Sequence, residues 1–203
     1  MIAVIDYGVG NLFSLTASLK YLGAETVVTN KKEDIVAADR IILPGVGAFE
    51  DAIAKLRATG LVETIIEETQ KGKPLLGICL GMQLLFEKSY EYGEHEGLGL
   101  IRGEIASIAE DLNDKTLKVP HIGWNSLSFD ADEPLFKYIN QGDYVYYVHS
   151  FYGRDCLENT IATSNYDITV TGAVRNGSVY GTQFHPEKSG NVGLNILKAF
   201  IEL

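Results

Sequence analysis

The sequence is poor in cysteine, proline and tryptophan, and it has no long apolar run. Its 203 residues include two Cys, five Pro and one Trp. Two cysteines leave little scope for disulfides, and with four histidines they give poor support to a structural zinc site. No apolar run approaches the ~20 residues that a membrane-spanning helix needs. The composition therefore argues against a disulfide scaffold, a zinc-stabilised domain and a transmembrane protein.

Positive charge is also scarce, with 17 Lys and Arg against 27 Asp and Glu and a formal net charge of -10. An acidic chain repels phosphate backbones, so we expect no nucleic-acid partner. The chain enters the strand-like stretch MIAVID at once, and we expect no signal or transit peptide. So few cysteines fit a reducing, cytoplasmic setting best.

Strands and helices alternate through the first ~90 residues, which is typical of a parallel sheet with helices on both faces. The predicted strands are residues 2–6, 25–29, 40–43 and 75–78, and the predicted helices are residues 12–22, 48–58 and 61–71. The second half differs. Residues 97–129 are predicted to be short, turn-rich segments with little helical periodicity.

Further strands are predicted near the C-terminal end, at residues 144–149, 160–164, 170–175 and 178–183. The Asn176-Gly177 pair predicts a hairpin between the last two. Residues 190–203 form an amphipathic pattern that predicts a helix docked on the sheet. We therefore expect a mostly parallel α/β fold with additional antiparallel strands, in a single domain that spans residues 1–203.

Residues 74–86, PLLGICLGMQLLF, combine an apolar run with a glycine-bracketed cysteine. A side chain on a sharp strand-to-helix turn needs small neighbours, and Gly77 and Gly81 flank Cys79. This nucleophile-elbow pattern predicts that Cys79 points out of the sheet toward solvent, at the start of a helix that includes residues 82–86. The positive end of a helix dipole favours a thiolate. A buried structural cysteine is the alternative interpretation.

A second motif, Phe184-His185-Pro186-Glu187, ends a predicted strand. Glu187 can fix the tautomer of His185 and steady its imidazolium, as the acid does in a catalytic triad. The alternative is a capped, solvent-exposed turn. A nucleophilic cysteine needs a base, so the presence of Cys79 favours the catalytic interpretation.

The stretch Pro44-Gly45-Val46-Gly47 follows the third strand. The N–H groups of Gly45, Val46 and Gly47 are free of bulky side chains and could point at a developing oxyanion. The second donor would be the N–H of Leu80, the residue after the nucleophile. A plain turn is the alternative.

Gln83 lies one helical turn beyond Cys79 and on the same helix face. It could hydrogen-bond a substrate amide or carboxylate, or it could be a solvated helix position.

Three unusual turns, at residues 7–11, 44–47 and 78–81, follow predicted parallel strands. Ligands bind beyond the carboxyl ends of such strands, so we expect these turns to line one site.

These motifs together resemble the class I (triad-type) glutamine amidotransferases. The matching stretches are residues 77–83 (GICLGMQ), 44–47 (PGVG) and 184–187 (FHPE). Further matches resemble the glutaminase subunits of imidazole glycerol phosphate synthase, at residues 6–11 (DYGVGN), 121–125 (HIGWN), 147–151 (YVHSF) and 188–189 (KS). The resemblance covers nearly the whole chain and implies a flavodoxin-like core with no metal or organic cofactor.

The resemblance implies a glutaminase mechanism. Cys79 attacks the side-chain amide of glutamine, and His185, oriented by Glu187, protonates the departing ammonia and then activates water. The oxyanion lies between the Leu80 N–H and the N–H groups of residues 45–47. The products are glutamate and ammonia.

The resemblance also implies how substrate and partner bind. Gln83 and the backbone of Ser150 and Phe151 hold the amino-acid end of glutamine. The ammonia passes to a (β/α)8-barrel cyclase subunit, the partner in a heterodimer, where an aminoimidazole-carboxamide ribonucleotide intermediate is converted to imidazole glycerol phosphate.

Trp124 is the only tryptophan, in a predicted Gly-Trp-Asn turn. A core aromatic is the simpler interpretation, although tryptophan is also enriched at interface hot spots. The resemblance implies that Trp124, with Asn11, Asn125 and Lys188, faces the partner.

Other functions stay open at this point. The chain could supply ammonia to another acceptor, of the vitamin B6 or anthranilate type. An intracellular cysteine peptidase can use the same elbow, and glutamine turnover against peptide cleavage separates the two. A non-catalytic binding module is the third possibility, which the combination of Cys79, His185 and Glu187 argues against.

Overall fold

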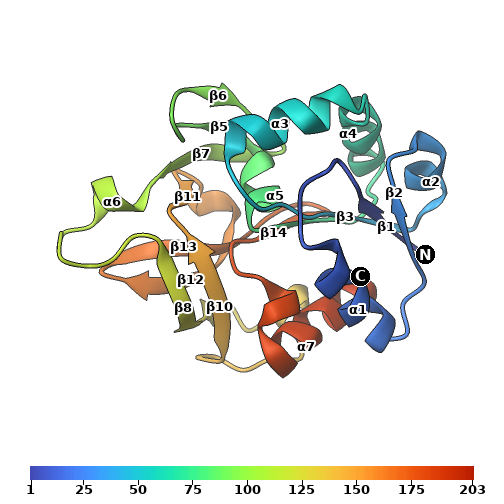
Figure 1. Ribbon diagram of the computed structural model, residues 1–203. Helices are drawn as coiled ribbons and strands as arrows, with labels where there is room; N and C mark the ends of the chain where they lie inside the picture. Colours follow the sequence, from blue (N-terminus) through green and yellow to red (C-terminus); the bar gives the residue numbers. More distant parts are fainter.

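The fold is organised around an eight-stranded sheet, and the computed structural model describes all of residues 1–203 (Figure 1). Across the sheet, the strands are β2 (Thr26–Thr29), β1 (Ile2–Ile5), β3 (Arg40–Leu43), β4 (Leu75–Ile78), β14 (Val179–Thr182), β13 (Ile168–Asn176), β12 (Thr160–Tyr166) and β9 (Ser128–Phe129). The first five are parallel, and the last three are added antiparallel. This order of parallel strands is flavodoxin-like, so the predicted fold class is confirmed.

Side chains along the parallel strands point alternately to the two faces of the sheet, which explains why helices cover both faces. In β1, Ile2 and Val4 belong to one core while Ala3 and Ile5 belong to the other, and all four are buried. The first core packs against α1 (Leu12–Tyr21) and α7 (Gly190–Ile201), and the second against α2 (Lys32–Ala37), α3 (Phe49–Ala58) and α4 (Val62–Gln70) (Figure 1). Each fully buried Ile or Leu side chain contributes roughly 1.5–3 kcal/mol to this packing.

Two smaller sheets lie beside the central one. Strand β8 (His121–Ser126) pairs with β10 (Tyr144–His149), and a four-stranded sheet contains β6 (His95–Glu96), β5 (Phe86–Ser89), β7 (Ile101–Ser107) and β11 (Phe151–Arg154). The remaining helical segments are α5 (Leu80–Leu84), α6 (Ile108–Asp111) and the 3₁₀ turns Pro134–Phe136, Leu157–Asn159 and Pro186–Lys188. The predicted hairpin between β13 and β14 is confirmed. No helix combines the length and apolarity that crossing a membrane requires.

The structure corrects the prediction in two places in the first half. Helix α2 was not predicted, and it is held by the single fully buried side chain of Ile35. The helix predicted over residues 82–86 ends at Leu84, and Phe86 begins strand β5 instead. Because Phe86 is fully buried and β5 pairs with β7, tertiary pairing decides the conformation against local helix propensity.

Residues 97–129 are also more ordered than predicted, since they contain β7 and β8. The stretch Gly123-Trp124-Asn125 is therefore part of a strand and not a turn. Gly123 has a φ of +129°, and the next two residues, Trp124 and Asn125, pair with Tyr146 and Val145 of β10. A glycine with such a φ hides the strand pattern in the sequence, and only the partner strand reveals it.

Candidate active site

Cys79 lies between β4 and α5 with an unusual backbone conformation, φ 53° and ψ −110°. A positive φ at a residue other than glycine typically costs about 1–3 kcal/mol and persists only where the surroundings enforce it. Here the Cys79 N–H donates to the Thr182 carbonyl of β14 (2.7 Å), and the Cys79 carbonyl accepts from the Gln83 N–H (3.1 Å). The predicted strand-to-helix elbow is present, and β14 holds it.

The two glycines of the elbow make room for backbone. A Cβ on Gly77 would lie 2.7 Å from the Gly81 carbonyl oxygen, and a Cβ on Gly81 would collide with the Leu43 carbonyl oxygen of β3. Both neighbours are main-chain atoms, which cannot move aside as a flexible side chain can. Close backbone approach therefore requires glycine at both positions, as the pattern predicts.

Cys79 is 7% exposed and lines a cavity of about 280 Å³. At this exposure Cys79 does not project into open solvent as predicted, and it lines the cavity instead. Most of the predicted site residues line the same cavity: Val46, Gly47, Leu80, Gln83, Ser150, Phe151, His185 and Lys188. Gly45, Asn11 and Glu187 line a smaller cavity of about 10 Å³, which His185 and Val46 share. The turns after β1, β3 and β4 therefore converge.

His185 and Glu187 form a buried pair, in which His185 Nδ1 lies 2.8 Å from Glu187 Oε1. Their side chains are 3% and 4% exposed, so the alternative of a solvent-exposed turn is wrong. Burial lowers the pKa of His185, but hydrogen bonding and charge from Cys79 and Glu187 outweigh it and raise the pKa to about 9. At pH 7 His185 is therefore mostly protonated and sits between the sulfur and the carboxylate.

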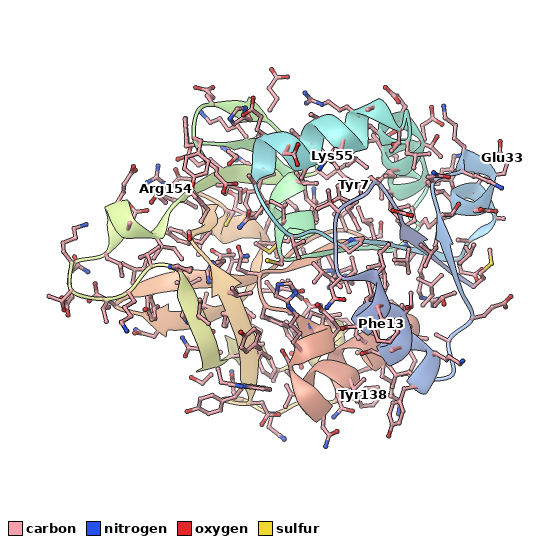
Figure 2. All side chains as sticks on the ribbon, viewed as in Figure 1. Tyr7, Phe13, Glu33, Lys55, Tyr138 and Arg154 are labelled. Atoms are coloured by element: carbon pink, nitrogen blue, oxygen red, sulfur yellow. The ribbon has the colours of Figure 1, made fainter.

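The stretch from Gly45 to Gly47 makes no backbone hydrogen bond with either its N–H or its C=O groups. Its start is fixed, because the buried Tyr7 hydroxyl donates to the Pro44 carbonyl (2.6 Å; Tyr7 is labelled in Figure 2). Burial, followed by the charge of Cys79, raises the pKa of Tyr7, so this hydroxyl keeps its proton. Leu80 opens α5, so its N–H has no carbonyl four residues earlier within the helix. Free donors are thus available on both sides of Cys79.

Gln83 is 5% exposed and not a solvated helix position. Its Nε2 donates to the Phe151 carbonyl (3.0 Å) and to Gln183 Oε1 (3.0 Å), so both amide hydrogens are in use. Gln83 can therefore offer the cavity only its carbonyl oxygen, an acceptor. Of the two predicted partners, a substrate amide or a carboxylate, this geometry favours a group with an N–H, because a carboxylate has no hydrogen to donate.

Glu91 lines the cavity as well, although it belongs to none of the sequence motifs. Its Oε2 accepts from the Phe49 N–H (2.7 Å), and burial raises its pKa. The residue lies in the turn between β5 and β6, far from every recognised motif. A carboxylate that faces a cavity beside a nucleophile could bind an ammonium group, but no local sequence signal points to it.

The residues expected to face a partner lie outside the cavity or at its edge. Trp124 is 55% exposed and packs edge-on against Tyr146 (ring centroids 6.0 Å apart), so it is not a core aromatic. Asn125 donates to the Asn165 carbonyl (2.9 Å), and Asn11 caps α1 by accepting from the Ser14 N–H (3.3 Å). These two asparagines have local structural roles in addition to any contact with a partner.

No group of three or more His, Cys, Asp or Glu side chains gathers where it could hold a metal ion.

The comparisons with known proteins agree along the full chain. A family model described as "Glutamine amidotransferase class-I" matches residues 3–203. Proteins named "Imidazole glycerol phosphate synthase subunit HisH" are similar. The one from Geobacillus thermodenitrificans is 49% identical over 99% of this chain and 95% of its own length. The one from Caldanaerobacter subterraneus is 48% identical over 100% and 98%.

Solved structures share the fold. The structure of PurLQS from Thermotoga maritima superposes with a TM-score of 0.74 at 21% identity, over 99% of this chain and 97% of that one. A structure described as a glutamine amidotransferase has a TM-score of 0.75 at 20% identity, over 100% and 98%. At this identity the likeness concerns the fold. The family model and the HisH relatives carry the identification: the chain belongs to the class-I glutamine amidotransferases and, within them, to the family of imidazole glycerol phosphate synthase HisH subunits.

Proposed function

We propose that this chain hydrolyses glutamine to glutamate and ammonia through a thioester on Cys79, as the glutaminase subunit of an imidazole glycerol phosphate synthase. The observation that carries the proposal is that Cys79 and His185 line one cavity, and that a 2.8 Å hydrogen bond joins His185 to the buried Glu187 behind it. Nucleophile, base and orienting acid in this order constitute a catalytic triad. The similarity to relatives named HisH is the reason for assigning the subunit to this synthase.

The first half of the reaction forms the thioester. The Cys79 sulfur attacks the side-chain amide carbon of glutamine, and the carbonyl π electrons move to oxygen. When this tetrahedral intermediate collapses, the C–N bond breaks and the leaving nitrogen takes a proton from His185. Because His185 has a pKa of about 9, this proton is in place at pH 7. Glu187 holds the imidazolium in the required orientation.

The second half releases glutamate. Neutral His185 takes a proton from water, the resulting hydroxide attacks the thioester carbon, and the C–S bond breaks to return the Cys79 thiolate and a protonated His185. The sum is glutamine plus water to glutamate plus ammonia. No step requires a metal or an organic cofactor.

The oxyanion is stabilised by N–H groups on either side of the sulfur. The Leu80 N–H opens helix α5, and the second donor comes from the stretch Gly45 to Gly47, whose amides have no other partner. Since Tyr7 fixes the Pro44 carbonyl, the peptide planes after Gly45 are those free to turn. In one orientation they present a carbonyl to the site, and in the other an N–H. We infer that the partner, with its nucleotide ligand bound, favours the N–H orientation, which requires tighter binding to that state.

The amino-acid end of glutamine carries an ammonium and a carboxylate, and the cavity offers partners for both. The Gln83 carbonyl and the Glu91 carboxylate accept from the ammonium group. The backbone N–H groups of Ser150 and Phe151, together with Lys188, are the candidates to bind the carboxylate. Charge complementarity thereby selects a free amino acid over an internal glutamine of a peptide.

The ammonia acceptor is the cyclase subunit, for which we propose a (β/α)8 barrel and a heterodimer. The proposed contact surface includes Asn11, Trp124, Asn125 and Lys188. Phe13, two residues after Asn11 on α1, is 84% exposed (labelled in Figure 2), and we include it in the proposed surface. Exposed aromatic side chains rimmed by polar groups are typical of protein interfaces. We place the complex in the cytoplasm, which suits the free thiols of Cys79 and Cys156.

The test is Cys79→Ala in the complex with the cyclase, with Cys156→Ser as the matched control. Cys79→Ala should abolish glutamine-dependent synthesis of imidazole glycerol phosphate and leave ammonia-dependent synthesis intact, because the thiol acts on glutamine alone. Cys156→Ser should retain both. Equal loss of the glutamine-dependent and ammonia-dependent activities in Cys79→Ala would contradict the proposal.

A further inference from the structure

A buried amide contacts the Cys79 sulfur from the side of β14. Gln183 is fully buried, and its Nε2 donates to Cys79 Sγ over 3.8 Å. Its Oε1 accepts from Gln83 Nε2 (3.0 Å), which also donates to the Phe151 carbonyl (3.0 Å). No other amide and no hydroxyl donates to this sulfur. Gln183 therefore links the nucleophile to the residue that presents its carbonyl to the cavity.

The same Phe151 carbonyl is the end point of a second buried chain. It accepts from His149 Nδ1 (2.9 Å), and His149 Nε2 lies 3.0 Å from His121 Nδ1. His121 Nε2 in turn lies 3.3 Å from Asn125 Nδ2. Asn125 directly follows the exposed Trp124 in β8. A continuous line of hydrogen bonds thus runs from the strand proposed to face the partner to the Cys79 sulfur.

The Phe151 carbonyl determines which atom donates in each hydrogen bond of this line. A carbonyl only accepts, so the Gln83 atom beside it is the nitrogen and His149 carries its proton on Nδ1. Burial lowers the pKa of His149 to about 3 and that of His121 to about 4, so both are neutral at pH 7. His149 Nε2 then accepts from His121 Nδ1–H, and His121 Nε2 accepts from Asn125. Both lone pairs of the Phe151 carbonyl are occupied, which locks the Gln83 amide.

Locking Gln83 also locks Gln183. With Gln83 Nε2 directed at Gln183 Oε1, the Gln183 amide has only its Nε2 left to present to Cys79. An amide N–H directed at sulfur favours the thiolate, because a hydrogen bond to a charged group is stronger than one to a neutral group. A flipped Gln183 amide would place an oxygen against the thiolate and repel it.

We propose that Gln183 is a positioning residue for the reaction, which holds the Cys79 thiolate through its side-chain N–H and is itself oriented by Gln83, Phe151 and the buried His149–His121 pair. The proposal rests on the nucleophilic role of Cys79. It assigns a purpose to a neutral histidine pair that the glutaminase steps do not use. It also couples two groups of the site: the Gln183 N–H that faces the sulfur and the Gln83 carbonyl that faces the substrate.

Gln183→Met tests the proposal, because methionine fills similar volume and lacks the amide. The measurement is the pH profile of Cys79 alkylation by iodoacetamide, followed on the Cys79 peptide by mass spectrometry, in the full complex in a Cys156→Ser background. Tyr7 and the His185–Glu187 pair also face this sulfur and are unchanged in every variant. We expect the midpoint of the profile to rise by about one pH unit or more, and the alkylation rate at pH 7 to fall roughly 10-fold to 100-fold. The KM for glutamine should rise as well, since Gln83 is released.

The controls separate positioning from folding. Thr182→Val removes a buried hydrogen bond from the neighbouring residue of β14, outside the line, and should lower the melting temperature without moving the alkylation profile. His149→Asn keeps an N–H for the Phe151 carbonyl and should stay near wild type, whereas His149→Leu should shift the profile in the same direction as Gln183→Met. Ammonia-dependent synthesis reports a folded complex in each variant.

An alkylation profile that is unchanged in a folded Gln183→Met complex would overturn the proposal, even if glutamine turnover by Cys79 is established. A wild-type complex that hydrolyses no glutamine would instead contradict the proposed function. The two failures are thus distinguishable.

Discussion

Two glycine-bracketed stretches line the same cavity and are built in opposite ways. The elbow around Cys79 is pinned, because its N–H and C=O groups are both bonded and its glycines are packed against backbone. The stretch after Pro44 makes no backbone hydrogen bond, and a Cβ on Gly47 would meet nothing within 4 Å. Gly47 has a φ of +98°, which glycine adopts without strain.

The difference shows that glycine serves two purposes in one site. At Gly77 and Gly81 it provides room for backbone, and the elbow that holds Cys79, the proposed nucleophile, is therefore preformed. At Gly47 it provides conformational freedom, and the proposed oxyanion donor would therefore be adjustable. A site with one fixed half and one adjustable half can be switched without disturbing the nucleophile. The following predictions test this contrast, from the largest expected effect to the smallest.

Gly81→Ala should disrupt the elbow around Cys79. Its Cβ would collide with the Leu43 carbonyl oxygen, so β3 and the elbow must separate, and we expect a loss of more than about 4 kcal/mol of folding free energy. Urea unfolding measures this. The control is Gly72→Ala, since Gly72 has open space around it, and although its positive φ (+92°) makes alanine strained there, the change should cost only about 1 kcal/mol. Similar costs for the two variants would contradict the assigned role of Gly81.

The buried His185 pair should make stability depend on pH. The pKa of His185 is raised from 6.5 to about 9 in the folded protein, so the stabilisation is fully present below pH ~6.5 and is lost as the pH rises through about 9. A shift of this size corresponds to about 3 kcal/mol. Unfolding free energies measured between pH 6 and pH 10 should fall accordingly, and the decline should be much smaller in His185→Asn. An equal decline in both proteins would show that other groups cause it.

Trp124→Ala should affect association and not the fold. Because Trp124 is 55% exposed, we expect its truncation to change the folding free energy by less than about 0.5 kcal/mol. Truncating an interface anchor typically costs ~2 kcal/mol of binding free energy. Thermal melts of the free subunit and binding titrations with the cyclase measure the two quantities. A large drop in melting temperature with unchanged affinity would contradict the proposed contact surface.

Gly47→Ala should restrict the conformational freedom of the stretch Gly45 to Gly47. No atom blocks the new methyl group, but the φ of +98° is strained for alanine, by roughly 1–2 kcal/mol. We expect a changed degree of activation by the partner at nearly unchanged partner affinity. Gly45→Ala is not an equivalent test, because its Cβ would lie 2.6 Å from the Gly81 N atom and disturb the elbow. A Gly47→Ala protein with wild-type activation would place the switch elsewhere.

The sequence predicts the features that depend on local pattern. Gly77 and Gly81 around Cys79 predict the elbow, and the apolar runs predict the strands of the parallel sheet. Features that depend on distant partners are not predicted. Phe86 is a strand residue only because β7 lies beside it, and Trp124 is in a strand only because β10 does.

The same distinction holds for the site. Glu91 reaches the cavity from a turn with no motif, so no local pattern identifies it. The roles of the Gln83 amide hydrogens depend on Phe151 and Gln183, which lie 68 and 100 positions further along the chain. Spacing alone therefore predicts that Gln83 faces the site, but not which of its atoms is free.

The central claim is that the nucleophile is preformed and the oxyanion hole is completed by the partner. The most direct measurement compares glutamine hydrolysis by the free subunit with hydrolysis by the complex that holds the cyclase's nucleotide ligand. One oxyanion donor is worth about 10²–10³ in rate, so turnover should rise by at least this order, mostly in kcat. Hydrolysis by the free subunit at the full rate of the complex would contradict the account.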